Sequence, residues 1–428
     1  MNPGNESTVY AVIVTNSYID TKPQMINEFI SLVYDAGYEP IFHVSQKVEI
    51  PHSATYLGSG FIAKLKEHLQ YIYDKNNVFH GKTVIACGFD LTGTQRANLK
   101  KTLGVEVIDR TFVILKIFEN HAHTKEAKLQ VDIASLTWSK NHLVNAEGAF
   151  SQVTSGGGLH NKGSGEKQIV LDRRHISNLI LAKKRELARI QLARKNSRTK
   201  RNNSGVYKIA IVGYTNAGKS TLMNHFIDFS GGEKKVVSKD ELFVTVETST
   251  REIYKYGYMR LFMTDTVGFV RNLPTTLVEA FKSTLEEINE ADLLVHVVDF
   301  SDSEYLDHIK TTNEILKEIG VDNIPTVYLY SKYDLIETPI RKLLDENSMY
   351  CSLINNDDIE EIYHFICSHL SEDWEEHKIE FPYESDYASF SADNYVISSL
   401  KNKNGYSCTV RLNPRTKFKY NYLLAKNS

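Results

Sequence analysis

An octapeptide with a glycine at each end of its loop stands near the middle of the chain: GYTNAGKS, from Gly213 to Ser220. The apolar run KIAIV precedes it and the helix-like stretch TLMNHFI follows, so a strand, a tight loop and a helix are expected in that order. The glycines let the backbone turn tightly and point its N–H groups at phosphate oxygens, and the helix N-terminus adds a favourable dipole. A bare match could be an ordinary glycine-rich turn, but the flanking pattern favours a P-loop. The chain is therefore expected to bind a nucleoside triphosphate.

The P-loop supplies most of the candidate nucleotide-binding residues. Lys219 is expected to reach the terminal phosphates and Ser220 the Mg²⁺. The full candidate set in this segment is Gly213, Asn216, Ala217, Gly218, Lys219, Ser220 and Thr221.

A second phosphate element is DTVG, from Asp265 to Gly268, which ends the apolar run LFMT. Asp265 can meet the Mg²⁺ shell, and the Gly268 N–H can meet the γ-phosphate. Thr245, in DELFVTVETSTR, is the candidate switch threonine that closes over Mg²⁺; the alternative is an ordinary strand threonine. Lys219, Thr245 and Gly268 are thus the catalytic candidates, and Ser220, Thr245 and Asp265 the metal candidates.

The base specificity is predicted from YSKYD, which ends at Asp334 and follows the apolar run TVYL. It resembles the NKxD motif of GTPases, with Ser331 in place of asparagine. Asp334 would accept hydrogen bonds from guanine N1 and the exocyclic amine, and Lys332 would pack across the base. Adenine lacks that pair of donors, so GTP is the expected ligand, although the serine leaves admission of ATP open. Ser352, in CSLIN, is the candidate for a further base contact.

Composition places limits on the kind of protein. No apolar run approaches the roughly 20 residues that a membrane helix needs, and the N-terminus has no basic region before its short apolar stretch. The four cysteines form neither a CxxC motif nor a metal-ligand spacing. We expect a cytoplasmic protein with reduced thiols, no metal on its cysteines and no membrane span.

The net charge of −3 hides a basic segment at residues 172–201, which holds eleven Lys and Arg residues. Apolar residues recur there at helical spacing: Ile176, Leu179, Ile180, Leu187 and Ile190. The cations would lie mainly on the other helix faces. Charge alone leaves two interpretations open, a solvated helix face and a nucleic-acid contact.

The order of patterns predicts an α/β fold class. Residues 1–110 alternate strands and helices, as in an α/β domain with a mainly parallel sheet. Residues 111–203 read as a hairpin of two long helices, one at 111–136 and one at about 168–201, joined across the glycine-rich stretch 155–166. Residues 204–373 read as a doubly wound P-loop GTPase domain, and residues 374–428 as a small α+β C-terminal domain.

With these elements placed, the chain resembles the HflX family of ribosome-associated GTPases over nearly its whole length. The resemblance is carried by ordered blocks: TYLGSGFIAKL, TQRANLKKTLGVEVIDRT, EAKLQVDIASL, GGGLHNKGSGE, GYTNAGKSTLMN, LFVTVETSTR and DTVGFVRNLPTTLVEAFKSTLEEINEADLLVHVVD. It implies binding of the large ribosomal subunit and its rRNA by a monomer. It also implies a role in splitting or rescuing stalled ribosomes, and protection against antibiotics at the peptidyl transferase centre. The alternative is a non-ribosomal GTP-dependent switch that regulates a protein partner.

Some positions depart from the family pattern. Phe269 stands where many GTPases place a water-orienting glutamine, so slow intrinsic hydrolysis and stimulation by the ribosome are expected. His142, assigned to the hairpin tip, stands where the family commonly has arginine, and the glycine-rich stretch has also lost arginines, which suggests altered ribosome contacts. Asn216 resembles the asparagine that binds K⁺ in some GTPases, and the alternative is that it only holds the loop.

Overall fold

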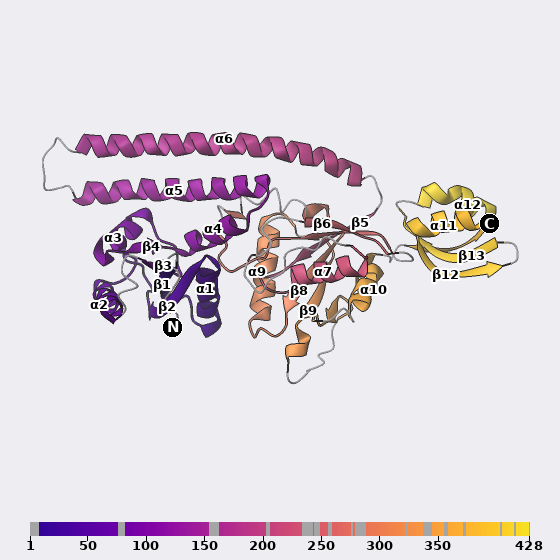
Figure 1. Ribbon diagram of the computed structural model, residues 1–428, viewed down its shortest axis with the longest axis horizontal. Helices are drawn as coiled ribbons and strands as arrows, with labels where there is room; N and C mark the ends of the chain where they lie inside the picture. The colour runs from indigo at the N-terminus through magenta and orange to yellow at the C-terminus, as the bar shows by residue number, and fades with distance from the viewer. Residues whose placement is uncertain are drawn as a thin grey trace. The chain divides into compact units, whose positions relative to one another are not determined.

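The computed structural model describes residues 8–75, 82–153, 162–202, 206–232, 243, 249–255, 259–274, 277–278, 288–321, 323–336, 345–354, 358–370, 374–402, 405–414 and 417–427. The chain divides into two compact units. The first unit comprises residues 1–190 with 273–281, and the second comprises 191–272 with 282–428. Figure 1 shows the elements of each unit.

The N-terminal part of the first unit is an α/β layer structure. Its described residues contain a four-stranded parallel sheet in the order β2-β1-β3-β4. The strands are β1 Val9–Asn16, β2 Tyr38–Gln46, β3 Thr83–Cys87 and β4 Glu106–Ile108. The helices are α1 Pro23–Asp35, α2 Ser59–Lys75 and α3 Gly93–Leu103. The mainly parallel sheet expected from the alternating pattern is confirmed.

The prediction of one helix over residues 111–136 is wrong, because the chain forms two helices there. Helix α4 spans Arg110–His121 and helix α5 spans Lys125–Val153. Ala122 leaves the helical conformation, with ψ of 108°. The Thr124 hydroxyl then accepts a hydrogen bond from the Ala127 N–H (3.2 Å), so a new helix begins with its own cap.

The first unit also contains a hairpin of α5 and α6. Helix α6 runs from Lys162 to Asn202, so its residues from Gln191 onward belong to the second unit. The two helices lie side by side (Figure 1) and share an apolar cluster of Leu129, Ile133 and Leu187, with Ile180 and Ile190 against it. An ion pair joins the Lys183 ammonium to the Asp132 carboxylate at 2.6 Å. The predicted hairpin is therefore confirmed. The glycine-rich stretch 155–166 was expected to be a loop, but its residues 162–166 are helical and belong to α6. Residues 155–161 lie outside the described residues.

The second unit contains the P-loop domain. Its described part holds a six-stranded sheet in the order β10-β9-β8-β5-β7-β6, parallel except for β6 beside β7. The strands are β5 Tyr207–Val212, β6 Ser249–Ile253, β7 Leu261–Asp265, β8 Leu293–Asp299, β9 Thr326–Ser331 and β10 Ser348–Tyr350. The helices are α7 Lys219–Phe229, α9 Tyr305–Glu318 and α10 Ile359–Leu370, and the short helices are η1 Ile288–Glu290 and η2 Tyr333–Leu335. The strand order reverses at β5, so a ligand site is expected at the carboxyl end of this strand.

The C-terminal part of the second unit is a small α+β layer structure, as predicted. Three antiparallel strands lie in the order β11-β13-β12, where β11 is Glu375–Phe381, β12 is Tyr395–Asn402 and β13 is Gly405–Leu412. The helices are α11 Glu384–Asp393, η3 Lys417–Tyr420 and α12 Asn421–Asn427. Its core is built on Ile379, Val410 and Leu412.

The four cysteines are free and buried. Within the part of the chain that the structure describes, no helix combines the length and the apolar character needed to cross a membrane.

Candidate functional site

The P-loop joins the carboxyl end of β5 to the N-terminus of α7. A Cβ atom at Gly213, where φ is +144°, would lie 2.2 Å from the backbone oxygen of Val297, so only glycine fits there. Asn216 (φ 58°) and Gly218 (φ 98°) adopt the left-handed conformation. Gly218 is the N-cap of α7 and provides no side-chain cap. The N–H groups in the first turn of α7 therefore have no side-chain cap from Gly218, so this helix N-terminus is suited to binding phosphate oxygens.

Lys219, Ser220 and Asp265 meet inside this turn. The Lys219 ammonium is buried and donates a hydrogen bond to the backbone oxygen of Tyr214 at 2.6 Å. Burial lowers the pKa of Lys219 to about 8, against the opposing effect of the Asp265 carboxylate, so Lys219 remains mostly charged at pH 7. The Ser220 hydroxyl donates to Asp265 Oδ2 at 2.8 Å. Because a hydroxyl oxygen and a carboxylate lie side by side, the donor set fits Mg²⁺, which prefers oxygen ligands.

The DTVG segment closes against the P-loop. The Thr215 N–H donates to the Phe269 backbone oxygen at 2.8 Å, and the Phe269 N–H donates to the Gly213 oxygen at 3.2 Å. A Cβ at Gly268 would lie 2.8 Å from Thr215 Cγ2 and 3.1 Å from Lys219 Nζ. The absence of a side chain at Gly268 is therefore what lets this segment approach the lysine. The Phe269 side chain, only 1% exposed, is part of the core.

The structure also brings the base-recognition segment to the P-loop through Ser331. Its hydroxyl is buried and lies 2.7 Å from the Ala217 oxygen and 3.0 Å from the Val298 oxygen, so one proton serves two carbonyls. Lys332 has a left-handed backbone (φ 57°), and its ammonium pairs with Asp299 Oδ2 at 2.7 Å. Asp334 lies in η2 with its side chain exposed.

Ser352 belongs to a loop that also touches the P-loop. Its N–H donates to Asp358 Oδ2 at 2.8 Å, and its hydroxyl accepts from the Ile354 N–H at 3.4 Å. The adjacent Leu353 packs against the loop, since its Cδ1 atom would lie 3.0 Å from a Cβ at Gly218. No sequence pattern singled out Leu353, because its position depends on the pairing of β10 with β9.

His296 is a further residue that the sequence analysis missed. It pairs with Val212 across β8 and β5, and it is 1% exposed. Burial and the nearby Lys219 charge lower its pKa to about 3, so the imidazole is neutral. Its signal was a single polar residue in the otherwise apolar run LLVHVV.

Thr245 lies outside the described residues. Thr221 is half-buried in the first turn of α7. The P-loop candidates lie together with Asp265, Gly268 and Ser331. Asp334 takes part in none of these contacts.

Three family models match the chain in succession. Residues 23–119 match the GTP-binding GTPase N-terminal family, and residues 121–201 match the GTP-binding GTPase middle region. Residues 208–332 match the family described as 50S ribosome-binding GTPase.

Relatives named GTPase HflX match most of the chain. GTPase HflX of Caldanaerobacter subterraneus subsp. tengcongensis is 37% identical over 84% of this chain and 80% of its own length. GTPase HflX of Alkalihalophilus pseudofirmus is 35% identical over 78% of this chain and 76% of its own. GTPase HflX of Escherichia coli is 35% identical over 74% of this chain and 71% of its own. With the P-loop geometry described above, these matches make the chain a GTP-binding GTP hydrolase that belongs to the HflX family.

Proposed function

We propose that the protein hydrolyses GTP in a cycle that is coupled to binding of the large ribosomal subunit, and that it acts in splitting or rescue of stalled ribosomes. The observation that supports GTP hydrolysis is that Ser220, Asp265 and Gly268 lie together beside the charged Lys219. Binding to the large ribosomal subunit is supported by the match to a family described as 50S ribosome-binding GTPase.

In the proposed site, Lys219 neutralises the terminal phosphates from within the loop, and the N-terminus of α7 adds its dipole. Ser220 and Asp265 would hold Mg²⁺, with Thr245 as the third proposed ligand. Bound Mg²⁺ would neutralise charge that develops on the phosphate oxygens. The Gly268 N–H would sense the γ-phosphate, and loss of that phosphate would release the segment after it.

For base recognition, we propose Asp334 as the acceptor for guanine N1 and its exocyclic amine, Lys332 as the group that covers the base, and Ser352 as a further contact. Ser331 acts indirectly, since its hydroxyl holds the Ala217 carbonyl of the P-loop. In this proposal Asn216 holds the left-handed turn of the loop, and K⁺ binding at Asn216 is the alternative.

The proposed rRNA contact is the exposed face of α6. Arg173, Arg174, Lys184, Arg185 and Arg189 are exposed along this helix. Lys183, in contrast, is held by Asp132 within the hairpin. Five exposed cations along one helix are suited to phosphates spaced along an RNA strand. In the alternative function, a non-ribosomal GTP switch, the same face would only be solvated.

Further elements of the proposal follow from the resemblance to the family. We propose a cytoplasmic monomer, a domain division at residues 1–110, 111–203, 204–373 and 374–428, and protection against antibiotics at the peptidyl transferase centre as a specialised role. His142 is removed from the proposed ribosome contacts, because the structure docks it on the N-terminal sheet domain. Its Nε2 lies 3.1 Å from the Leu91 oxygen and 3.3 Å from Asp109 Oδ2.

The test is cosedimentation with isolated large subunits in the presence of GDP or a non-hydrolysable GTP analogue. We expect tighter binding with the analogue, and a fall of about two to three orders of magnitude in affinity between about 50 and 200 mM salt if five cations meet phosphates. A variant with Arg185 and Arg189 changed to glutamine should have a smaller salt dependence. Equal affinity in both nucleotide states would exclude the coupled cycle, and a weak salt dependence would favour the protein-partner switch.

A further inference from the structure

The Thr215 hydroxyl is a buried polar group in the phosphate-binding loop. Thr215 is 6% exposed, and among the residues that the structure describes its Oγ1 atom has no hydrogen-bond partner. Most buried hydroxyls have a partner, because an unmade hydrogen bond away from water destabilises the folded state. A valine would fill the same space without that cost. A hydroxyl at such a position is explained if its partner arrives with the ligand.

The contacts of Gly268 place the Thr215 side chain at the proposed γ-phosphate position. A Cβ at Gly268 would lie 2.8 Å from Thr215 Cγ2 and 3.1 Å from Lys219 Nζ. Because Cγ2 and Oγ1 are branches of the same carbon, the hydroxyl lies close to the point where Gly268 meets the Lys219 ammonium. These are the two groups proposed above to contact the terminal phosphate. The unpartnered hydroxyl is therefore a neighbour of the reacting group.

The backbone that carries this hydroxyl is held on both sides. The Thr215 N–H donates to the Phe269 oxygen at 2.8 Å, and the hydroxyl of the preceding Tyr214 accepts from the Arg271 N–H at 2.8 Å. The Arg271 guanidinium in turn pairs with Glu304 at 3.0 Å, and both of these side chains are mostly buried. Thr215 is thus positioned before a ligand arrives, as is required of a group that orients a reactant.

A group that orients the attacking water is needed here, because Phe269 occupies the glutamine position of many GTPases and its side chain lies in the core. A threonine hydroxyl has one donor and two acceptor positions, so it can contact a water and a phosphate oxygen at once. We propose that the Thr215 hydroxyl accepts a hydrogen bond from the attacking water and donates one to a γ-phosphate oxygen. This assignment rests on the proposed GTPase cycle and gives it a catalytic residue.

The reaction itself leaves the hydroxyl unchanged. The water oxygen forms a bond to the γ-phosphorus while the bond from this phosphorus to the β,γ-bridging oxygen breaks. The bridging oxygen leaves with the bonding electron pair as part of GDP. One proton of the water stays on the phosphate product, and the other passes to solvent. Thr215 keeps its proton throughout, so its contribution is orientation of the water.

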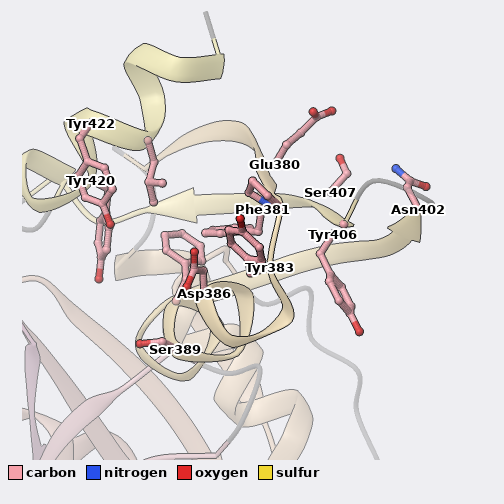
Figure 2. Close-up of a pocket in the computed structure, with 14 residues that line it drawn as sticks. Glu380, Phe381, Tyr383, Asp386, Ser389, Asn402, Tyr406, Ser407, Tyr420 and Tyr422 are labelled. Carbon is pink, nitrogen blue, oxygen red and sulfur yellow. The ribbon is translucent and has the colours of Figure 1, made fainter.

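Nucleotide binding elsewhere in the chain would confuse a measurement at this site. The C-terminal part of the same unit holds a pocket of about 670 Å³, with Tyr383, Tyr406 and Tyr420 among its lining residues (Figure 2). Aromatic rings can stack on a base. The experiment therefore begins with calorimetry of a non-hydrolysable GTP analogue. We expect one molecule to bind per wild-type chain and at least 100-fold weaker binding in Lys219→Ala, because Lys219 contacts the phosphates.

The test compares three variants of the full-length protein: Thr215→Val, Thr215→Ser and Thr312→Val. Valine keeps the shape of threonine without the hydroxyl, and serine keeps the hydroxyl without the methyl group. Thr312, on α9, is the matched control, since it is fully buried and its Oγ1 atom also has no partner in the described part of the chain. The measurements are single-turnover GTP hydrolysis, affinity for GDP and for the GTP analogue, and urea unfolding without nucleotide.

We expect Thr215→Val to hydrolyse GTP about 10- to 100-fold more slowly, the effect of one hydrogen bond to a charged group. Its GDP affinity should be unchanged, and its affinity for the GTP analogue should fall by less than the rate. Its urea midpoint should equal or exceed that of the wild type, because an unpartnered buried hydroxyl is lost. Thr215→Ser should retain most of the rate. Thr312→Val should have the wild-type rate and an equal or higher midpoint.

Three results would overturn the assignment. They are a wild-type rate in Thr215→Val, a urea midpoint in that variant that falls together with the rate, and a loss of rate in Thr215→Ser as large as in Thr215→Val. An equal loss of rate in Thr312→Val would also overturn it. Absence of GTP hydrolysis by the wild type, alone and with large ribosomal subunits, would overturn the proposed function and this assignment together.

Discussion

Replacement of Gly268 by alanine tests the geometry at the heart of the site. The new Cβ would lie 2.8 Å from Thr215 Cγ2, 2.9 Å from Thr215 Cα and 3.1 Å from Lys219 Nζ. Thr215 Cα belongs to the P-loop backbone and cannot swing aside as a side-chain end can. The segment that carries residue 268 must therefore move away from the loop.

The cost of that movement can be bounded from the contacts. Adding a methyl group to a packed interior typically costs about 1–3 kcal/mol. Separation also weakens the two backbone hydrogen bonds between Phe269 and the P-loop, each worth about 0.5–1.5 kcal/mol. We expect the nucleotide-free variant to lose about 1–3 kcal/mol of unfolding free energy. Affinity for a GTP analogue should fall about 10- to 100-fold, since one charge-assisted hydrogen bond contributes about 1.5–3 kcal/mol, and GDP affinity should change little.

The assay combines urea unfolding with titration of fluorescent GDP and of a fluorescent GTP analogue in the presence of Mg²⁺. The matched control is Gly60→Ala, because a Cβ at Gly60 meets nothing within 4 Å. This control should keep wild-type affinity and should not lower the unfolding free energy, because alanine is favoured over glycine in a helix such as α2. The reasoning would be refuted if Gly268→Ala left both the unfolding free energy and the affinity for the GTP analogue at wild-type values.

Three further changes have outcomes that the contacts determine. Ser331→Ala removes the donor to the Ala217 carbonyl and should lower the unfolding free energy by about 1–3 kcal/mol, as urea unfolding would show; an unchanged midpoint would contradict it. Burial lowers the pKa of His142, but its hydrogen bonds with Asp109 and a helix carbonyl outweigh this effect, so the pKa is raised overall. The protonated imidazole therefore stabilises the folded state fully below about pH 6.5, and this stabilisation is lost as the pH rises through the raised pKa. His142→Gln should remove this part of the pH dependence in thermal unfolding, and identical profiles would exclude it. Lys219→Ala should weaken GTP binding at least 100-fold by calorimetry, on the order of two charge-assisted hydrogen bonds, and wild-type affinity would refute the assignment.

Local requirements of the backbone were predictable from the sequence. Gly213 and Gly218 are needed because their φ angles are positive and their neighbours are close, and this need is visible in the motif itself. Asp265 follows an apolar strand, and parallel strands end at one edge of a sheet, so its meeting with Ser220 could also be predicted.

Features that depend on competition between local signals, or on distant partners, were not predictable. The apolar pattern continues through residues 111–136, but the Thr124 cap starts a new helix within it. The family pattern places His142 in the hairpin tip, and nothing in its neighbours along the chain indicates Leu91 or Asp109 as partners. Leu353 reaches the P-loop only through sheet register.

The most direct measurement of the central claim is GTP turnover by the purified protein, alone and with isolated large ribosomal subunits, with Lys219→Ala as the inactive control. The core position of Phe269 removes that side chain from water positioning, so a low rate is expected for the protein alone. If the ribosome completes the site, turnover should rise by about 10³ to 10⁵. Tight GTP binding with no rise on addition of large subunits would contradict a ribosome-coupled GTPase.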